Sequence, residues 1–145
     1  VPLISDRTVI RLDAAEAARK QEKWQAVAIE AAKQCGQNWL PTVALPQTPR
    51  AFLDAASGHE LRLIASLQPG ARHPRTLLEE ATQTLGRRPA SALVMVGPEG
   101  DFTPAEIALA LGSGCQPITL GPIILRTETA ALYCLSILSY ELQAG

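Results

Sequence analysis

Continuous apolar runs in this 145-residue chain alternate with segments in which apolar residues recur every three or four positions. The runs at residues 61–67, 91–96 and 117–120 predict buried strands, because a strand covered on both faces is apolar at nearly every position. Shorter runs at residues 1–4, 8–12 and 42–45 predict further extended segments. This alternation predicts one α/β domain with a mostly parallel sheet and helices on both faces.

Helix-capping patterns predict where the helices begin and end. Asp13 can cap a long helix that closes at Gly36, because a short polar side chain accepts hydrogen bonds from the free N–H groups of the first turn. Thr103 and Glu106 form a capping box with a proline at the first helical position. The predicted helices cover residues 14–35, begin at Pro49, run from Pro74 to near Gly86, run from Pro104 to Gly112 or Gly114, and cover residues 125–142.

Composition agrees with this class of fold and limits the functions. Hydrophobic residues make up 47% of the chain and aromatic residues only 4%, which is typical of a core of Ala, Leu, Ile and Val between helices and a sheet. Lys and Arg number 13 against 14 Asp and Glu, which gives a formal net charge of −1. The chain therefore lacks the excess of basic charge that usually accompanies nucleic-acid binding.

The sequence also indicates a compartment. The longest apolar stretches are about seven residues, far short of a membrane span, and the first residues do not resemble a secretory signal. Cys35, Cys115 and Cys134 form no C-x-x-C pair and have no neighbouring histidine. We therefore expect a cytoplasmic protein with buried free thiols, no membrane segment and no metal.

The segment Val96-Gly97-Pro98-Glu99-Gly100-Asp101-Phe102 joins a predicted strand to the capped helix. Ligands of α/β sheets lie at the carboxyl ends of strands, and glycine lets the backbone approach a ligand closely. Two carboxylates without a lysine would repel phosphate. They suit a cationic or hydroxyl-rich ligand such as S-adenosylmethionine, although a plain strand–helix turn with polar caps is the alternative.

A second loop, Leu120-Gly121-Pro122-Ile123-Ile124-Leu125-Arg126-Thr127-Glu128-Thr129-Ala130, also leaves a strand and enters a helix. Thr127 or Glu128 can cap that helix, and Arg126 and Glu128 lie at the start of a very apolar segment. An exposed Arg–Glu pair of little energetic value is the alternative interpretation. Two Gly-Pro loops at neighbouring strand ends favour a binding site.

The two loops together carry a specific resemblance. Gly97-Pro98-Glu99-Gly100, followed further along by Leu120-Gly121-Pro122 and by Leu125-Arg126-Thr127-Glu128-Thr129-Ala130, resembles the RsmE family, the 16S ribosomal RNA uridine N3-methyltransferases of the SPOUT superfamily. Residues 4–9 match the family's strand segment. The family's long helix and its exit are matched by Trp24, Ile29, Glu30, Ala31, Gln34, Gly36 and Pro41. The resemblance covers essentially the whole chain.

The resemblance implies a fold and a cofactor. The family folds as an α/β domain with a C-terminal trefoil knot, which physical reasoning about a sequence would not predict because knots are rare. It implies a homodimer that binds S-adenosylmethionine. The apolar last helix, with Leu132, Leu135 and Leu138, is a candidate dimer face, although core packing is as good an interpretation of each residue. The implied cofactor-binding residues are Leu67, Val96, Gly97, Pro98, Glu99, Gly100, Leu120, Gly121, Ile124, Leu125, Thr129 and Ala130.

The resemblance also implies methyl transfer to N3 of a uridine in 16S rRNA. This nitrogen must lose its proton to attack, and a nearby positive group would stabilise the developing anion. Arg126 is the candidate for that role or for binding an RNA phosphate. Glu128 is the candidate for orienting Arg126 or assisting proton removal.

The chain departs from the family pattern at three places. Asp101 lies where the family often has glycine, and Ile123 and Gln37 lie where it commonly has arginine, so two potential RNA contacts are missing. The family also begins with a β-barrel RNA-binding domain, followed by a strand and a helix. We expect residues 1–145 to be a SPOUT methyltransferase domain without those parts. A SPOUT methyltransferase with another RNA target, and a non-catalytic nucleoside- or RNA-binding dimerisation module, are the alternatives.

Overall fold

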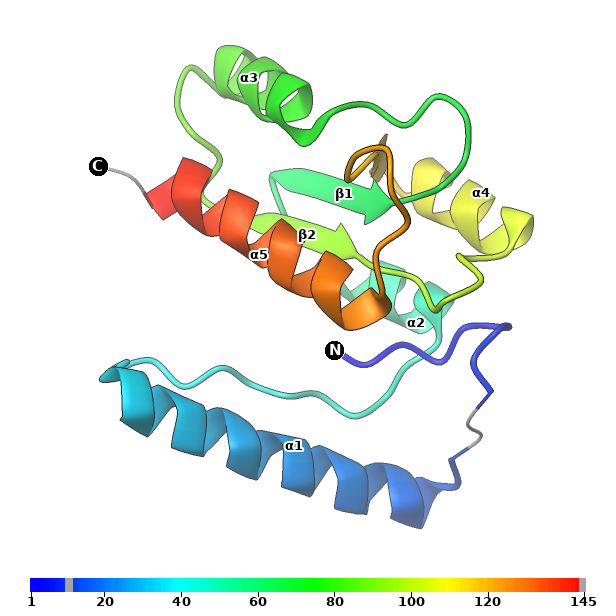
Figure 1. Cartoon of the computed structure of the whole chain (residues 1–145), viewed down its shortest axis with the longest axis vertical. Helices are drawn as coiled ribbons and strands as arrows, with labels where there is room; N and C mark the ends of the chain where they lie inside the picture. Colours follow the sequence, from blue (N-terminus) through cyan, green and yellow to red (C-terminus); the bar gives the residue numbers. More distant parts are fainter. Residues whose placement is uncertain (10–11, 144–145) are drawn as a thin grey trace.

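The computed structural model describes residues 1–9 and 12–143 and confirms the predicted α/β class (Figure 1). The predicted extended segment at residues 8–12 includes Ile10 and Arg11, which lie outside the described residues. The elements follow in the order α1 (Ala14–Cys35), α2 (Pro49–Ala55), β1 (Leu61–Ala65), α3 (Pro74–Leu85), β2 (Ala92–Met95), α4 (Pro104–Gly112), β3 (Gln116–Ile118) and α5 (Thr127–Gln143).

The described strands form a three-stranded sheet in the order β2-β1-β3. Both pairs are parallel, with Ile64 beside Met95 on one side and beside Pro117 on the other. The segment that leaves β1 returns to the far side of β3, where Arg72 pairs with Ile118. Two backbone hydrogen bonds hold this contact, from Arg72 N–H to the Pro117 carbonyl and from Thr119 N–H to the Arg72 carbonyl, each 3.0 Å. β3 therefore lies between β1 on one side and Arg72, in the segment that follows β1, on the other.

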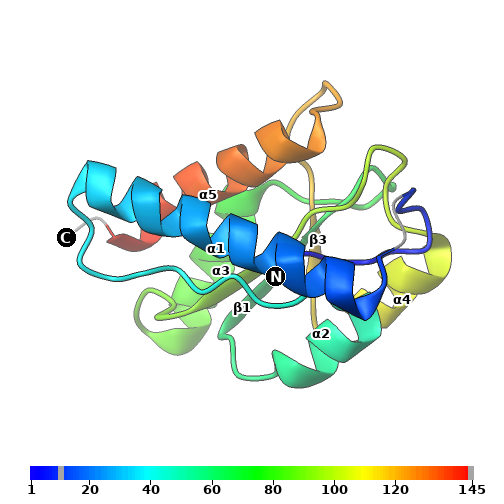
Figure 2. The same cartoon turned by 90° about the horizontal axis from the view of Figure 1, so that it is seen from below.

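Helices cover both faces of the sheet, as the apolar runs predict. On one face, α2 and α4 pack on β1 and β2 through a core cluster that includes Leu53, Ile64, Met95, Phe102 and Ile107. On the other face, α3 and α5 pack through a cluster that includes Leu61, Leu63, Leu77, Ile118 and Cys134. In Figure 2, α2 and α4 lie together at the lower right while α5 lies on the opposite, upper side.

The predicted strand at residues 42–45 is not formed. Gln25 donates from Nε2 to the Pro41 carbonyl (3.0 Å) and accepts from the N–H of Val43 through Oε1 (2.8 Å). Gln21 donates to the Val43 carbonyl at 2.7 Å. Side chains of α1 thus form the hydrogen bonds with the backbone of residues 41–43 that a neighbouring strand would otherwise form. The local apolar pattern gave no sign of these bonds.

Several other expectations need correction. Residues 1–4 make one isolated bridge, between Leu3 and Gln47, instead of a strand of the sheet. The last helix begins at Thr127, two residues later than predicted. Cys35 is exposed, whereas Cys115 and Cys134 are buried as expected. Burial raises the pKa of the Cys134 thiol to about 11. Within the described ranges, no helix combines the length and apolar character needed to cross a membrane.

Candidate functional site

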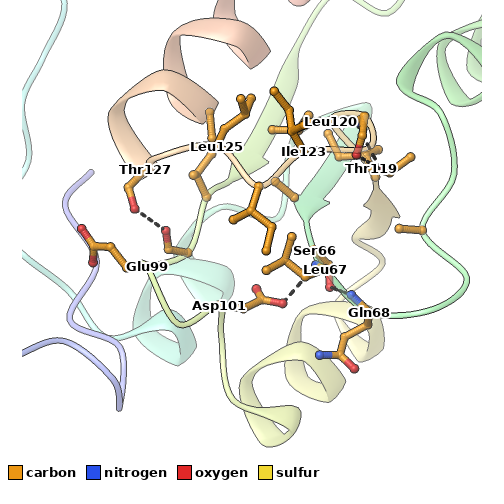
Figure 3. Close-up of a pocket in the computed structure, with 18 of the residues that line it drawn as sticks. Ser66, Leu67, Gln68, Glu99, Asp101, Thr119, Leu120, Ile123, Leu125 and Thr127 are labelled. Atoms are coloured by element: carbon orange, nitrogen blue, oxygen red, sulfur yellow. Dashed lines mark hydrogen bonds between the residues drawn. The ribbon is translucent and has the colours of Figure 1, made fainter.

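A cavity of about 380 Å³ opens at the carboxyl ends of the strands (Figure 3). Its volume falls within the range of small-molecule sites, about 300–1,000 Å³. Three loops form its walls, because parallel strands bring their carboxyl ends to the same edge of a sheet. The walls consist of residues 65–71 after β1, residues 96–99 and Asp101 after β2, and residues 118–125 after β3, with Thr127 and Ala130 from the start of α5.

The cavity brings together most of the residues that the sequence predicted to bind a cofactor. Those that line it are Leu67, Val96, Gly97, Pro98, Glu99, Leu120, Gly121, Ile124, Leu125 and Ala130. Gly100 and Thr129, also predicted, are not among the lining residues. Arg126 and Glu128, the predicted catalytic residues, do not line it either, and both are exposed beside it at the start of α5.

Asp101 lines the cavity and contacts a distant loop, which reasoning from the sequence did not predict. Its side chain is buried, and its Oδ2 accepts a hydrogen bond at 3.1 Å from the N–H of Leu67, which follows β1 (Figure 3). Its Oδ1 accepts from the N–H of Phe102 at 2.8 Å. The sequence offered only its departure from the family's usual glycine as a signal, because Asp101 and Leu67 are 34 positions apart.

Thr127 joins the second and third loops. The sequence offered Thr127 or Glu128 as a cap of the last helix, but the hydroxyl of Thr127 donates to the carbonyl of Gly97 at 3.1 Å. The backbone of the loop after β2 is thereby fixed to the first residue of α5. Together with the bond between Asp101 and Leu67, this contact ties the three walls of the cavity to one another.

Glycine is needed at two points of these loops. A Cβ added at Gly97 would lie 3.1 Å from both the backbone nitrogen and the ring of Phe102, so a larger residue would displace the loop. Gly121 has φ of 112°, a conformation that side chains strongly disfavour. Glycine is therefore needed at both positions for reasons within the loops themselves, and the close approach of Gly97 and Gly121 to a ligand stays a prediction.

The lining combines apolar side chains with several polar groups. Leu120, Ile123 and Leu125 contribute apolar side chains, while no Lys or Arg occurs among the described residues that form the walls. Glu99 is exposed and lies at the edge of the group of side chains in Figure 3. Such a cavity can hold a flat apolar ring and a positively charged or hydroxyl-bearing ligand, and it is poorly suited to phosphate. In the described part of the chain, no group of three or more His, Cys, Asp or Glu residues is placed to hold a metal ion.

Comparison with known families identifies the domain. The pattern of the RNA methyltransferase domain family matches residues 1–139. This chain belongs to that family.

Individual relatives agree. The chain is 33% identical over 144 residues to ribosomal RNA small subunit methyltransferase E of a Synechocystis strain, covering 99% of this chain and 45% of the relative. It is 32% identical over 141 residues to the protein of that name from Bacillus subtilis, covering 97% and 55%. The chain thus spans about half the length of the curated relatives it matches. These matches confirm the resemblance to the RsmE family that the two loops indicated.

Solved structures show the same fold. A methyltransferase from Legionella pneumophila in complex with bound SAM superposes with a TM-score of 0.84 and 34% identity, covering 96% of this chain and 53% of that one. Ribosomal RNA small subunit methyltransferase E from Neisseria gonorrhoeae, bound to S-adenosyl methionine, gives 0.79 and 34%, covering 97% and 55%. The position of β3 between β1 and Arg72 agrees with the SPOUT-type C-terminal trefoil knot that the resemblance implies.

Proposed function

We propose that this chain is the cofactor-binding domain of an S-adenosylmethionine-dependent methyltransferase that modifies N3 of a uridine in 16S rRNA. The observation that carries the proposal is the cavity at the carboxyl ends of the strands. Its walls are built from the two loops that carry the RsmE-like motifs, together with the loop after β1. Solved relatives with 34% identity contain SAM, which supports the same cofactor here.

The cavity fits the proposed cofactor. Adenine suits the apolar walls that Leu120, Ile124 and Leu125 provide, and the absence of Lys and Arg from the described lining suits a positive sulfonium. Ribose hydroxyls need acceptors and donors, which the glycine-rich backbone after β2 and the hydroxyl of Thr119 supply. When bound, S-adenosylmethionine supplies an electrophilic methyl group.

We assign the roles in catalysis to Arg126 and Glu128 at the start of α5. Both side chains are exposed next to the cavity and do not line it, so they are accessible to an RNA base that enters beside α5. The guanidinium of Arg126 would stabilise the uridine anion as the proton at N3 leaves, or bind an RNA phosphate. Glu128 would orient Arg126 or assist proton removal.

The proposed domain organisation places most RNA affinity elsewhere in the protein. The chain has a net charge of −1, and Ile123 and Gln37 lie where the family commonly has arginine. Because the chain spans about half the length of its relatives, we assign residues 1–145 to the methyltransferase domain, without its first strand and helix. An RNA-binding β-barrel domain of the intact cytoplasmic protein would supply the contacts with rRNA.

We also propose that the intact protein is a homodimer that pairs through α5. Leu132 and Leu135 are 66% and 59% exposed on this helix, and Tyr140 is 77% exposed. Large exposed apolar side chains on one helix are typical of a protein–protein interface. Leu138, by contrast, packs against the core cluster beneath α3 and α5, so it is not one of these exposed side chains.

Methyl transfer by the intact protein tests this proposal. The protein is incubated with labelled S-adenosylmethionine and small ribosomal subunits, and the modified base is identified by mass spectrometry. We expect 3-methyluridine, and we expect Arg126→Ala to lower kcat roughly a hundredfold, the usual cost of removing one group that stabilises a transition-state charge. The cofactor Kd should stay unchanged, since Arg126 does not line the cavity.

The control is Arg75→Ala, which removes an exposed arginine from α3 and should leave kcat unchanged. Full turnover by Arg126→Ala would eliminate the role assigned to Arg126. Methylation at another nucleotide would favour the SPOUT enzyme with a different RNA target. Cofactor binding without transfer to any RNA would favour a non-catalytic module.

A further inference from the structure

Asp101 adopts a backbone conformation that aspartate rarely takes. Its φ is 61°, and among the described residues it alone has a positive φ without being glycine. A side chain in this region meets its own backbone, so the conformation persists only where other contacts hold it in place. Glycine would adopt the same turn without strain. The contacts of the aspartate side chain are therefore what distinguishes Asp101 from a glycine in this turn.

The side chain links two walls of the cavity. Asp101 follows β2 in the chain, and Leu67 follows β1, yet the carboxylate accepts the N–H of Leu67 at 3.1 Å. Its other oxygen accepts the N–H of Phe102 at 2.8 Å, which fixes the direction of the carboxylate. The side chain is 8% exposed, so water competes little for these bonds. The carboxylate thus forms a direct hydrogen bond between the loops after β1 and β2.

Arg7 makes a second contact with the turn that contains Asp101. Nη1 of Arg7 donates to the carbonyl of Gly100, and it lies 3.5 Å from the carbonyl of Asp101. The neighbouring Asp6 N–H donates to Oε1 of the buried Glu106 in α4 at 2.9 Å. The backbone of the turn is thus held by Arg7 while its side chain is held by Leu67.

We propose that Asp101 is a positioning residue for the cofactor, which fixes the width of the cavity by tying the loop after β2 to the end of β1. This inference rests on the proposed cofactor site in that cavity. Each carboxylate oxygen accepts one backbone N–H, and the inference assigns the effect of Asp101 on the ligand to the position of the loops that these bonds hold.

Two substitutions separate the effect of the Asp101 hydrogen bonds from the effect of its unfavourable backbone conformation. In Asp101→Asn the amide keeps one acceptor oxygen, so one of the two hydrogen bonds is lost while the unfavourable φ remains. In Asp101→Gly both bonds are lost but the unfavourable φ is relieved. Both variants therefore weaken the hydrogen bonds between the loops, but only Asp101→Gly relieves the backbone strain.

Calorimetric titration of the intact protein with S-adenosylmethionine and with S-adenosylhomocysteine, alongside thermal unfolding, tests the inference. We expect both variants to bind each ligand at least tenfold more weakly than the wild type. Asp101→Gly should unfold at or near the wild-type temperature, so that its weaker binding cannot be attributed to loss of stability. Asp54→Asn, an exposed carboxylate of α2, is the control and should bind like the wild type.

Each other outcome is decisive. Wild-type affinity in a folded Asp101→Gly would overturn the inference and leave the proposed cofactor site intact. Weaker binding of S-adenosylmethionine alone would also overturn it, because the two ligands differ only in the sulfonium methyl group and its positive charge, and the carboxylate would then act by direct attraction to that charge. Failure of a folded wild type to bind either ligand would overturn the proposed function together with the inference.

Discussion

At the scale of single residues, an ion pair fixes the entry to β1. Oε1 of Glu60 accepts from Nη2 of Arg87 at 2.6 Å, and its Oε2 accepts from Arg87 Nη1 at 2.9 Å and from the N–H of Ala90 at 2.7 Å. This geometry joins the start of β1 to the chain that leads from α3 into β2. The Arg87 guanidinium and the Ala90 N–H lower the pKa of Glu60 from 4.5 to about 2.

The lowered pKa predicts a pH-dependent contribution to stability. Because the folded pKa lies below the unfolded one, the contribution is fully present above about pH 4.5 and is lost as the pH falls towards 2. We expect Glu60→Gln to lower the urea midpoint at pH 7 and to differ progressively less from the wild type as the pH falls from 4.5 to 2. Glu30→Gln, which breaks the exposed pair with Lys33, is the control and should change the pH 7 midpoint little. An undiminished difference at pH 2 would contradict the assignment.

Single residues also mark the limit of what the sequence predicts about the site. Gly97 and Gly121 were predicted to permit close approach of the backbone to a ligand, whereas the structure gives two other reasons for glycine, the contact of Gly97 with Phe102 and the positive φ of Gly121. The bond from Thr127 to Gly97 spans 30 positions, and the contact of Arg7 with Gly100 spans 93. No local pattern records such partners, because they depend on how distant loops meet in the folded chain.

At the scale of elements, capping residues determine where helices begin. Thr103 accepts the N–H of Glu106, and Glu106 accepts the N–H and hydroxyl of Thr103, which completes the predicted capping box of α4. Such boundaries could be predicted because a cap and its partners lie within four residues. The strand expected at residues 42–45 could not be rejected in the same way, because its backbone bonds go to Gln21 and Gln25 of α1.

Removal of the cap of α4 should lower stability. We expect Thr103→Ala to reduce the free energy of unfolding by about 1 kcal/mol, since the N–H of Glu106 loses its partner and the Glu106 carboxylate loses its hydroxyl contact. Chemical denaturation of the purified protein measures the change. Thr76→Ala, an exposed position in the first turn of α3, is the matched control and should be neutral or slightly stabilising. Equal stability of Thr103→Ala and the wild type would show that the box contributes nothing.

At the scale of the whole molecule, the fold brings three distant loops to one edge of a small sheet. The sequence predicted the parallel sheet, its covering helices and two of the three loops, because each is written in a local pattern. The course of the chain around β3, where Arg72 pairs with Ile118, required the structure. It is this course that brings residues 68–71 to the cavity.

The proposed dimer is a property of the whole molecule and predicts a change in mass. Replacing both Leu132 and Leu135 by Glu would place charges on the exposed face of α5, where they could not be desolvated without cost. We expect light scattering to show a monomer for this variant and a dimer for the intact wild type. Leu111→Glu, an exposed leucine of α4, should remain dimeric. A variant that stays dimeric would place the interface elsewhere.

The central claim is that the cavity between the three loops binds S-adenosylmethionine. Calorimetric titration of the intact wild-type protein and of Gly97→Ala tests it most directly, because a Cβ at Gly97 would meet Phe102 at 3.1 Å and displace the loop. Gly112→Ala, where a Cβ meets open space, is the control. We predict binding in the micromolar range for the wild type and the control, and binding weakened at least tenfold for Gly97→Ala. No binding by a folded wild type, or equal binding by folded Gly97→Ala, would contradict the claim.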